Sequence, residues 1–309
     1  MNRLIEVPSR NSKESDLQIA KQSKVNKPSK KYSSNSGGLI NRIPAIVAFV
    51  DEHLGEFKDK CTLITTEEAL HEYIDKCLDS QIVAIDTETT GLNTRVDKIV
   101  GIGLYTPNDK PCYIPVRHKN YITLEYSEEN VPLDVLQKEL SRLENIRENI
   151  MFNANFDLRM LWFDLRVRLH CTWDCSLASR LLNENEKDKR LKPLHKKYVL
   201  RGKDDAFTYS EIFGNTEFAL IPTKTAYLYG AHDPLITYEY YDYQRKYIYY
   251  ESDCTLEDRN GMYGVSLGFF NIERPCVDAT VNMETNGVCI DLEYAGELKV
   301  KYEALQEEK

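Results

Sequence analysis

The stretch Ile-Asp-Thr-Glu-Thr-Thr-Gly-Leu at residues 85–92 joins two acids to an apolar run that starts near Gln81. The run predicts a buried strand over residues 81–88. Asp86 and Glu88 are two residues apart on that strand, so both side chains leave the same face. Burying two carboxylates together is costly unless a cation pairs with them. The stretch therefore predicts a cation site at the end of a buried strand.

Two further blocks place acids beside apolar segments, and they end at Asp157 and Asp233. Tyr229 lies four residues before Asp233, so on a helix the two share one face. Pro234 follows directly, which predicts a kink or a junction between helices. Hard carboxylate oxygens suit magnesium or manganese, and such a cluster suits two-metal phosphodiester hydrolysis.

The periodicity of apolar residues predicts an α/β fold with a mixed sheet flanked by helices. Strands are expected at residues 62–65, 81–88, 99–105, 112–116 and 150–153. Helices are expected at 39–60, from a capping box at 65–68 to residue 78, and at 133–143, 156–163, 174–182, 191–199 and 227–250. Pro44 is expected in the first turn of the first helix. Two more helices are expected after Pro275.

Composition bounds the kind of protein. The chain has 309 residues, a net charge of −9 and eight cysteines without a CxxC pair, which we interpret as reduced thiols of a cytoplasmic protein. Apolar runs are shorter than the ~18 residues of a membrane span. Residues 1–38 hold eight basic and three acidic residues, which predicts a disordered basic tail. That tail could contact a phosphate backbone or simply aid solubility.

The three acidic blocks, in this order, resemble the Exo I, Exo II and Exo III motifs of DEDD-family 3′–5′ exonucleases, and Tyr229 resembles the DEDDy branch. The resemblance implies an RNase H-like exonuclease domain over residues 61–255, preceded by the 39–60 helix. Residues 256–309 resemble a linker and the start of the thumb in a family A DNA polymerase, at Ile-Glu-Arg-Pro 272–275 and Met283 to Asp291. We therefore expect a fragment or split product of a phage or bacterial polymerase, located in the host cytoplasm if viral, without polymerase activity of its own.

The resemblance also implies a role for individual residues. Asp86, Glu88 and Asp233 would hold a first Mg²⁺ or Mn²⁺ ion, with Asp86 bridging to a second ion that Asp157 holds largely through water. Tyr229 would orient the attacking water. The expected substrate contacts are Thr89, Leu92 as an apolar wedge, Asn153 on the terminal nucleotide and Phe156 beneath the site. The implied partners are a single-stranded or frayed 3′ end of DNA and the remainder of a polymerase supplied in trans, with no membrane.

Several alternatives stay open at this point. The chain could be an RNA-trimming exonuclease similar to ribonuclease D, or a non-catalytic module that binds DNA or a polymerase. Asn153 could merely cap the helix that carries Asp157, and Leu92 could be an ordinary core residue. The tyrosines between residues 238 and 250 are expected to form a packed helix face, with a platform for stacking bases as the lesser alternative. The basic stretch 187–197 is either a DNA-backbone contact or a solvated loop and helix.

Overall fold

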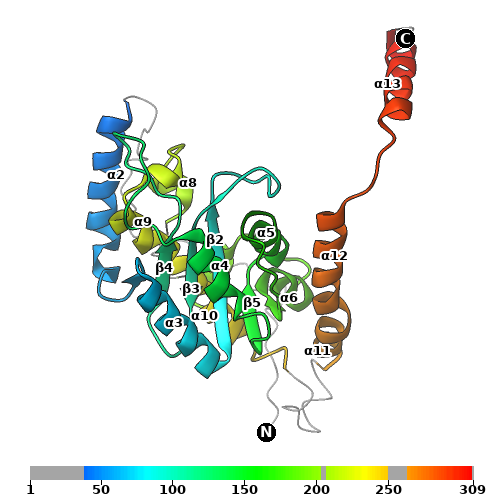
Figure 1. Cartoon of the computed structure of the whole chain (residues 1–309). Coiled ribbons are helices and arrows are strands. Elements are labelled where there is room, and N and C mark those ends of the chain that lie inside the picture. The colour runs from blue at the N-terminus through cyan, green and yellow to red at the C-terminus, as the bar shows by residue number, and fades with distance from the viewer. Residues whose placement is uncertain (1–37, 203–206, 250–262, 308–309) are drawn as a thin grey trace.

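The computed structural model describes residues 38–202, 207–249 and 263–307, so the predicted basic tail lies outside the described residues except for Gly38 (Figure 1). Six strands form one mixed sheet in the order β1-β4-β3-β2-β5-β6. β3 runs antiparallel to both β2 and β4, whereas β5 is parallel to β2 and β6 is parallel to β5. The strands are β1 Thr62–Leu63, β2 Ile82–Thr89, β3 Ile99–Tyr105, β4 Cys112–Pro115, β5 Glu148–Met151 and β6 Trp173–Asp174. The predicted mixed sheet is confirmed.

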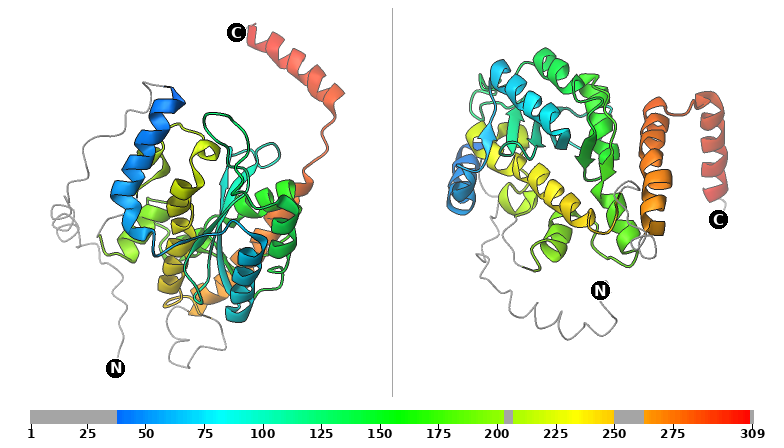
Figure 2. Two further views of the ribbon diagram at one scale, coloured as in Figure 1. Left: turned by 60° about the vertical axis from the view of Figure 1, so that its left-hand side comes forward. Right: turned by 90° about the horizontal axis from the view of Figure 1, so that it is seen from below.

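Helices cover both faces of this sheet (Figures 1 and 2). One face packs against α3 (Glu67–Ser80), α4 (Leu133–Ser141) and α5 (Ala154–Met160), and α5 continues as a π-helical turn at Leu161–Leu165. The helices associated with the other face are α2 Leu39–Leu54, α6 Cys175–Leu182, α7 Leu191–Tyr198, α8 Tyr209–Ile212, α9 Thr223–Gly230 and α10 His232–Gln244. Successive side chains of a strand point to opposite faces, so Val83 and Ile85 pack on the first side while Ala84 packs on the second.

The structure corrects several local predictions. α2 already begins at Leu39, so Pro44 lies in its second turn rather than its first. The capping box predicted at 65–68 does not form, because Thr66 is the N-cap of α3 and its side chain accepts a hydrogen bond from Ala69 N–H. β5 begins two residues before the predicted strand. The stretch predicted at 227–250 is two helices, α9 and α10, joined at Ala231, which is the junction that Pro234 predicted.

Segments outside the sheet region also join its core. Ile43, Ile46 and Val50 of α2 are buried with residues of α9, so the first helix shares the core of the sheet domain. Near the other end, α11 (Tyr263–Gly268), a π-helical turn (Phe269–Glu273) and α12 (Arg274–Asn286) follow one another, and α12 lies beside α5. α13 (Leu292–Glu307) buries none of its residues and stands apart from the sheet and its helices (Figures 1 and 2).

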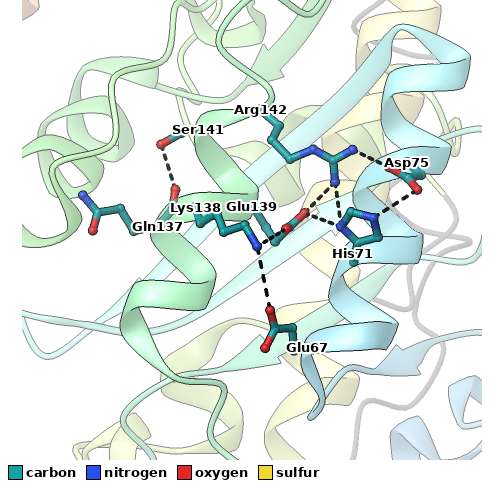
Figure 3. Close-up of polar contacts among 8 residues, drawn as sticks. All are labelled: Glu67, His71, Asp75, Gln137, Lys138, Glu139, Ser141 and Arg142. Carbon is teal, nitrogen blue, oxygen red and sulfur yellow. Dashed lines mark hydrogen bonds and ion pairs between the residues drawn. The ribbon is translucent and has the colours of Figure 1, made fainter.

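A charged network joins α3 to α4, which lie on the same face of the sheet (Figure 3). Glu139 is 1% exposed, and its carboxylate accepts hydrogen bonds from Arg142, at 2.6 Å, and from the His71 ring, at 3.1 Å. Burial alone would raise the pKa of Glu139, but the hydrogen bonds from Arg142 and His71 lower it overall. Arg142 also pairs with Asp75 of α3, so one guanidinium fastens the two helices together.

The described cysteines form no disulfides, and the described helices are not of the membrane-spanning kind. Every cysteine in the described part of the chain is a free thiol, which agrees with the predicted reduced state; Cys254 lies outside that part. None of the helices within the described ranges is both long and apolar enough to cross a membrane.

Candidate active site

Three of the predicted acids converge where β2 meets α10. Asp86 and Glu88 project from β2 toward Asp233 in the first turn of α10, and one oxygen from each of the three carboxylates lies within 4.8 Å of the others. Within the part of the chain that the structure describes, this is the one group of three His, Cys, Asp or Glu side chains close enough to share an ion. The geometry is that of an oxygen-rich cation site.

The neighbouring strand leaves room for this cluster. Gly103 and Gly101 of β3 lie directly across from Asp86 and Glu88 in the strand register. A β carbon on Gly103 would lie 2.2 Å from the backbone oxygen of Gly230, so only a glycine lets the α9–α10 junction approach the sheet this closely. The register also shifts between Glu88 and Thr89, as in a β-bulge, and bulges are common beside active sites.

Asp157 approaches the cluster from the opposite face of the sheet. It is 4% exposed, lies in the first turn of α5, and is not one of the three convergent acids. Its Oδ1 accepts hydrogen bonds from both the backbone N–H of Thr87, at 3.0 Å, and the Thr87 hydroxyl, at 2.6 Å. Thr87 stands between Asp86 and Glu88 in sequence, so it places Asp157 beside them while pointing the other way.

The acids repel one another, and the protein shields them partly from water. Burial, followed by the charges of Asp157, Asp233 and Glu88, raises the pKa of Asp86 well above its usual range. Burial and then Asp233 raise the pKa of Glu88 to about 8. Burial raises the pKa of Asp157 to about 7 although the two hydrogen bonds from Thr87 lower it. Such an arrangement stabilises a bound cation, because a cation favours the charged form of every member.

Tyr229 lies one helical turn before Asp233 and is almost fully buried. Its ring packs edge-on against Phe213 and Tyr209, at centroid distances of 5.2 and 6.1 Å. Burial, then the charges of Asp233 and Glu88, raises the pKa of Tyr229 well above its usual range, so the phenol stays protonated. Its hydroxyl accepts a hydrogen bond from Lys192 Nζ at 2.8 Å.

The turn after β2 carries Leu92 at its surface. Leu92 is 86% exposed, so the core interpretation of this residue is wrong, and an apolar side chain projects into solvent four residues after Glu88. The Thr89 hydroxyl donates to the backbone oxygen of Gly91 at 2.8 Å and shapes the start of the turn. On its far side the turn is fastened by Arg95, which donates to the backbone oxygens of Glu284 and Thr285 at the end of α12, each at 2.9 Å.

Asn153 and Phe156 lie at the start of α5. Asn153 is the N-cap residue in a left-handed conformation, with φ of 66°, but its side chain makes no capping hydrogen bond, so the capping interpretation is wrong. Asp174 takes that role instead, because its carboxylate accepts from the backbone N–H groups of Asn153 and Ala154 as well as from Ser176 N–H in α6. Phe156 is partly buried against the core on the α3 side of the sheet.

Sequence reasoning missed three residues that organise the site. Asp174 was expected only as the first residue of the helix at 174–182, whereas its carboxylate caps α6 and also accepts from the backbone N–H of Ala154 at the start of α5. Thr87 carried no prediction, because its hydrogen bond to Asp157 spans 70 residues of sequence. Lys192 was included only in the basic stretch 187–197, because its contact with Asp233 spans 41 residues of sequence.

Comparisons with known proteins agree with this geometry. A family model described as a 3′–5′ exonuclease matches residues 61–248. DNA polymerase I of Chloroflexus aurantiacus is 25% identical over 244 residues, which are 77% of this chain and 24% of that protein. DNA polymerase I of Borreliella burgdorferi is 27% identical over 232 residues, which are 75% of this chain and 23% of that protein. The chain thus spans about a quarter of the length of these relatives.

A solved structure supports the fold. The POL domain of Pol1 from M. smegmatis, in complex with DNA primer-template and dNTP, has a TM-score of 0.51 at 12% identity, over 79% of this chain and 35% of that one. A likeness at this identity concerns the fold alone, and it agrees with the predicted RNase H-like sheet flanked by helices. The family match covers more than half of the chain and all three acidic blocks. The chain belongs to the 3′–5′ exonuclease family of the family A DNA polymerase type, a family of hydrolases.

Proposed function

We propose that the acids at the β2–α10 junction hydrolyse the 3′-terminal phosphodiester of a DNA strand and release nucleoside 5′-monophosphates. The observation that carries this proposal is the convergence of Asp86, Glu88 and Asp233 from elements almost 150 residues apart in sequence, with their oxygens within 4.8 Å. Asp157 approaches the same place from the other face of the sheet and adds a fourth carboxylate.

The donor set fits two divalent cations, Mg²⁺ or Mn²⁺, because all of its donors are carboxylate oxygens. Asp86, Glu88 and Asp233 would hold the first ion, while Asp86 and Asp157 would hold the second. When bound, two such ions would stabilise the attacking and the leaving oxygens of an in-line displacement. Without a bound cation, the pKa values of Glu88 and Asp86 are raised, which means that their charged forms are unfavourable. A bound cation would stabilise those charged forms.

The chain's own groups would position the reactants. The protonated hydroxyl of Tyr229 orients the attacking water, whose oxygen forms the new bond to phosphorus while the bond to the 3′ oxygen breaks. The shortened strand keeps a 3′-hydroxyl, and the released nucleotide carries the phosphate on its 5′ oxygen. Leu92 would wedge beside the last base, and Asn153, with a side chain that makes no capping hydrogen bond, would contact the terminal nucleotide. Thr89 and Phe156 would support this nucleotide from the β2 turn and from α5.

We further propose DNA as substrate and proofreading as the role, because the curated relatives are DNA polymerases. Residues 61–255 would form the exonuclease domain, and residues 256–309 a linker and the start of a polymerase thumb. The remainder of a polymerase would be the partner that delivers a frayed 3′ end. A single-stranded or mismatched end should be preferred, since the terminal base must leave the duplex to reach a buried site.

The test uses a 5′-labelled DNA primer with a 3′ mismatch, the purified protein and Mg²⁺, with a chelator control. The proposal predicts stepwise shortening from the 3′ end that the chelator abolishes, faster on the mismatched than on the paired primer. An RNA strand of the same sequence runs in parallel. Shortening of RNA alone would instead favour the ribonuclease D-like function, and binding of DNA without shortening would favour a non-catalytic module.

A further inference from the structure

The side chain of Lys192 reaches the acidic cluster from α7, a third element beside β2 and α10. Lys192, in the first turn of α7, lies with its Nζ 2.9 Å from Asp233 Oδ1 and 2.8 Å from the Tyr229 hydroxyl. The same ammonium lies 4.0 Å from the centroid of the Tyr229 ring, in a cation–π contact. Its side chain is only 12% exposed, whereas most lysines keep their charge in water.

The position of Lys192 is supported by its own helix. The next residues of α7 include Leu194, which is buried in the core beside α10, and His195, which lies 2.6 Å from Glu239 of α10. α7 and α10 therefore pack side by side, and both begin at the acidic cluster. An ammonium placed in this way has little freedom to leave, so its neighbours must compensate its charge.

The contacts of Lys192 fall into two kinds. Its contact with Asp233 is an ion pair to a carboxylate that the proposed function assigns to a divalent cation, so the ammonium and that cation attract the same group. Its contact with Tyr229 is different, because Nζ can only donate and the phenol oxygen must accept. The phenol proton is then directed away from Lys192.

We propose that Lys192 is a built-in cation that offsets the acidic cluster before a divalent ion binds and that fixes the direction of the Tyr229 hydroxyl during hydrolysis. The inference rests on the proposed function of the same site. It makes Lys192 a positioning residue with two separable effects. Lys192 weakens the binding of divalent ions, because like charges repel, and it raises the rate once the ions are bound.

The test compares Lys192→Met with the wild-type protein, after removal of metal, in two measurements. Mn²⁺ binding is followed by the electron paramagnetic resonance signal of free Mn²⁺, which needs no substrate. Exonuclease turnover is measured on the mismatched primer at saturating Mn²⁺. Lys246→Met is the matched control, because it removes one exposed charge just beyond the C-terminal end of α10, where Lys246 pairs only with Asp242 in the ion pairs of the described chain.

We expect Lys192→Met to bind Mn²⁺ at least about tenfold more tightly and to turn over at least about tenfold more slowly, with Lys246→Met unchanged in both. Unchanged or weaker Mn²⁺ binding in Lys192→Met would overturn the proposal, and so would unchanged turnover. Lys192→Gln, which is neutral but keeps a hydrogen-bond donor, replaces the methionine variant if that variant does not fold, and the same tightening is expected. If the wild-type protein neither binds Mn²⁺ nor shortens DNA, the proposed function itself fails rather than this inference.

Discussion

Thr87 lies between Asp86 and Glu88 in sequence and positions a third acid, Asp157, by hydrogen bonding. The alternation of a strand sends Asp86 and Glu88 toward α10 and Thr87 toward α5, where both its N–H and its hydroxyl meet Asp157 Oδ1. The backbone N–H is present whatever the side chain, so only the hydroxyl depends on threonine. A hydrogen bond from this hydroxyl to a buried carboxylate is worth roughly 1.5–3 kcal/mol.

We predict that Thr87→Val lowers exonuclease turnover by about tenfold or more, because Asp157 loses one of two donors and gains freedom to rotate. Turnover is measured on single-stranded DNA at saturating Mg²⁺. Thr87→Ser keeps the hydroxyl and should stay close to the wild type. Equal turnover of the valine and serine variants would show that the hydroxyl does not position Asp157.

Spacing in the sequence predicted the individual acids but not the residues that position them through hydrogen bonds and ion pairs. Asp86, Glu88 and Asp233 were predicted from i, i+2 and i, i+4 spacing next to apolar runs, and they converge. Lys192, Thr87 and Asp174 act across 41, 70 and 20 residues of sequence, respectively, through contacts that only the folded chain creates. A residue whose role depends on a long-range contact leaves no local pattern to read.

At the scale of elements, the closeness of β3 to the α9–α10 junction decides where Asp233 lies. Gly103 faces the backbone oxygen of Gly230, and the ring of Pro234 lies next to it. The boundaries of β2 and β3 could be predicted from their apolar runs to within about a residue. The division of the 227–250 stretch at Ala231 could be predicted only from Pro234, and β5 was misplaced because its polar residues Glu148 and Asn149 are buried.

We predict that Gly103→Ala separates β3 from α9 and thereby disrupts the cluster. The added β carbon would lie 2.2 Å from a backbone oxygen, which can only be relieved by moving the helices, so stability should fall by about 1–3 kcal/mol and exonuclease activity by more than tenfold. Urea unfolding and the primer assay measure the two effects. Gly264→Ala, at a helical glycine with open space around it, is the matched control and should not lower either. A fully active Gly103→Ala protein would contradict this view of the junction.

His118 follows β4 and hydrogen-bonds to the segment before α9. Because it is buried, we expect the stability of the folded protein to depend on pH. Its Nδ1 lies 2.8 Å from the Ile221 carbonyl, which can only accept, so Nδ1 carries the proton and Nε2 accepts from the Tyr113 hydroxyl. Burial lowers the pKa of His118 from 6.5 to about 4. Between these values the unfolded chain binds a proton that the folded protein does not, so stability falls as the pH falls from 6.5 to 4.

The expected result is that His118→Gln, although less stable at pH 7, loses less stability than the wild type between pH 6.5 and 4. Urea unfolding midpoints at several pH values in this range measure the difference. Parallel losses in the two proteins would mean that His118 does not stay neutral in the folded state.

In the molecule as a whole, α12 is joined to the elements that carry the site. Val277 of α12 is buried in the core beside α5, and Glu284 pairs with Arg159, two residues after Asp157. Arg95 caps the end of α12 from the turn that carries Leu92. A cation at the C-terminal end of a helix is favourable, because the last carbonyls there lack partners.

We therefore predict that Arg95→Ala increases the mobility of the turn at residues 90–98 and of the last turn of α12. Amide hydrogen exchange should become faster at residues 90–98 and at the last turn of α12, while the sheet stays protected. Val96→Ala, at a neighbouring exposed position of the same turn, is the control and should leave exchange unchanged. Unchanged exchange in Arg95→Ala would show that the turn keeps its shape without α12.

If the carboxylates of β2 and α10 form one hydrolytic centre, the rate of 5′-mononucleotide release should depend on Asp86, and Asp86→Asn tests this dependence. The substitution keeps the size of the side chain and removes a charge that the proposed function assigns to both ions. We predict a folded protein with a rate at least about 1,000-fold below the wild type at saturating Mn²⁺, since about 4 kcal/mol of transition-state stabilisation is lost. A rate within tenfold of the wild type would contradict it and place hydrolysis elsewhere.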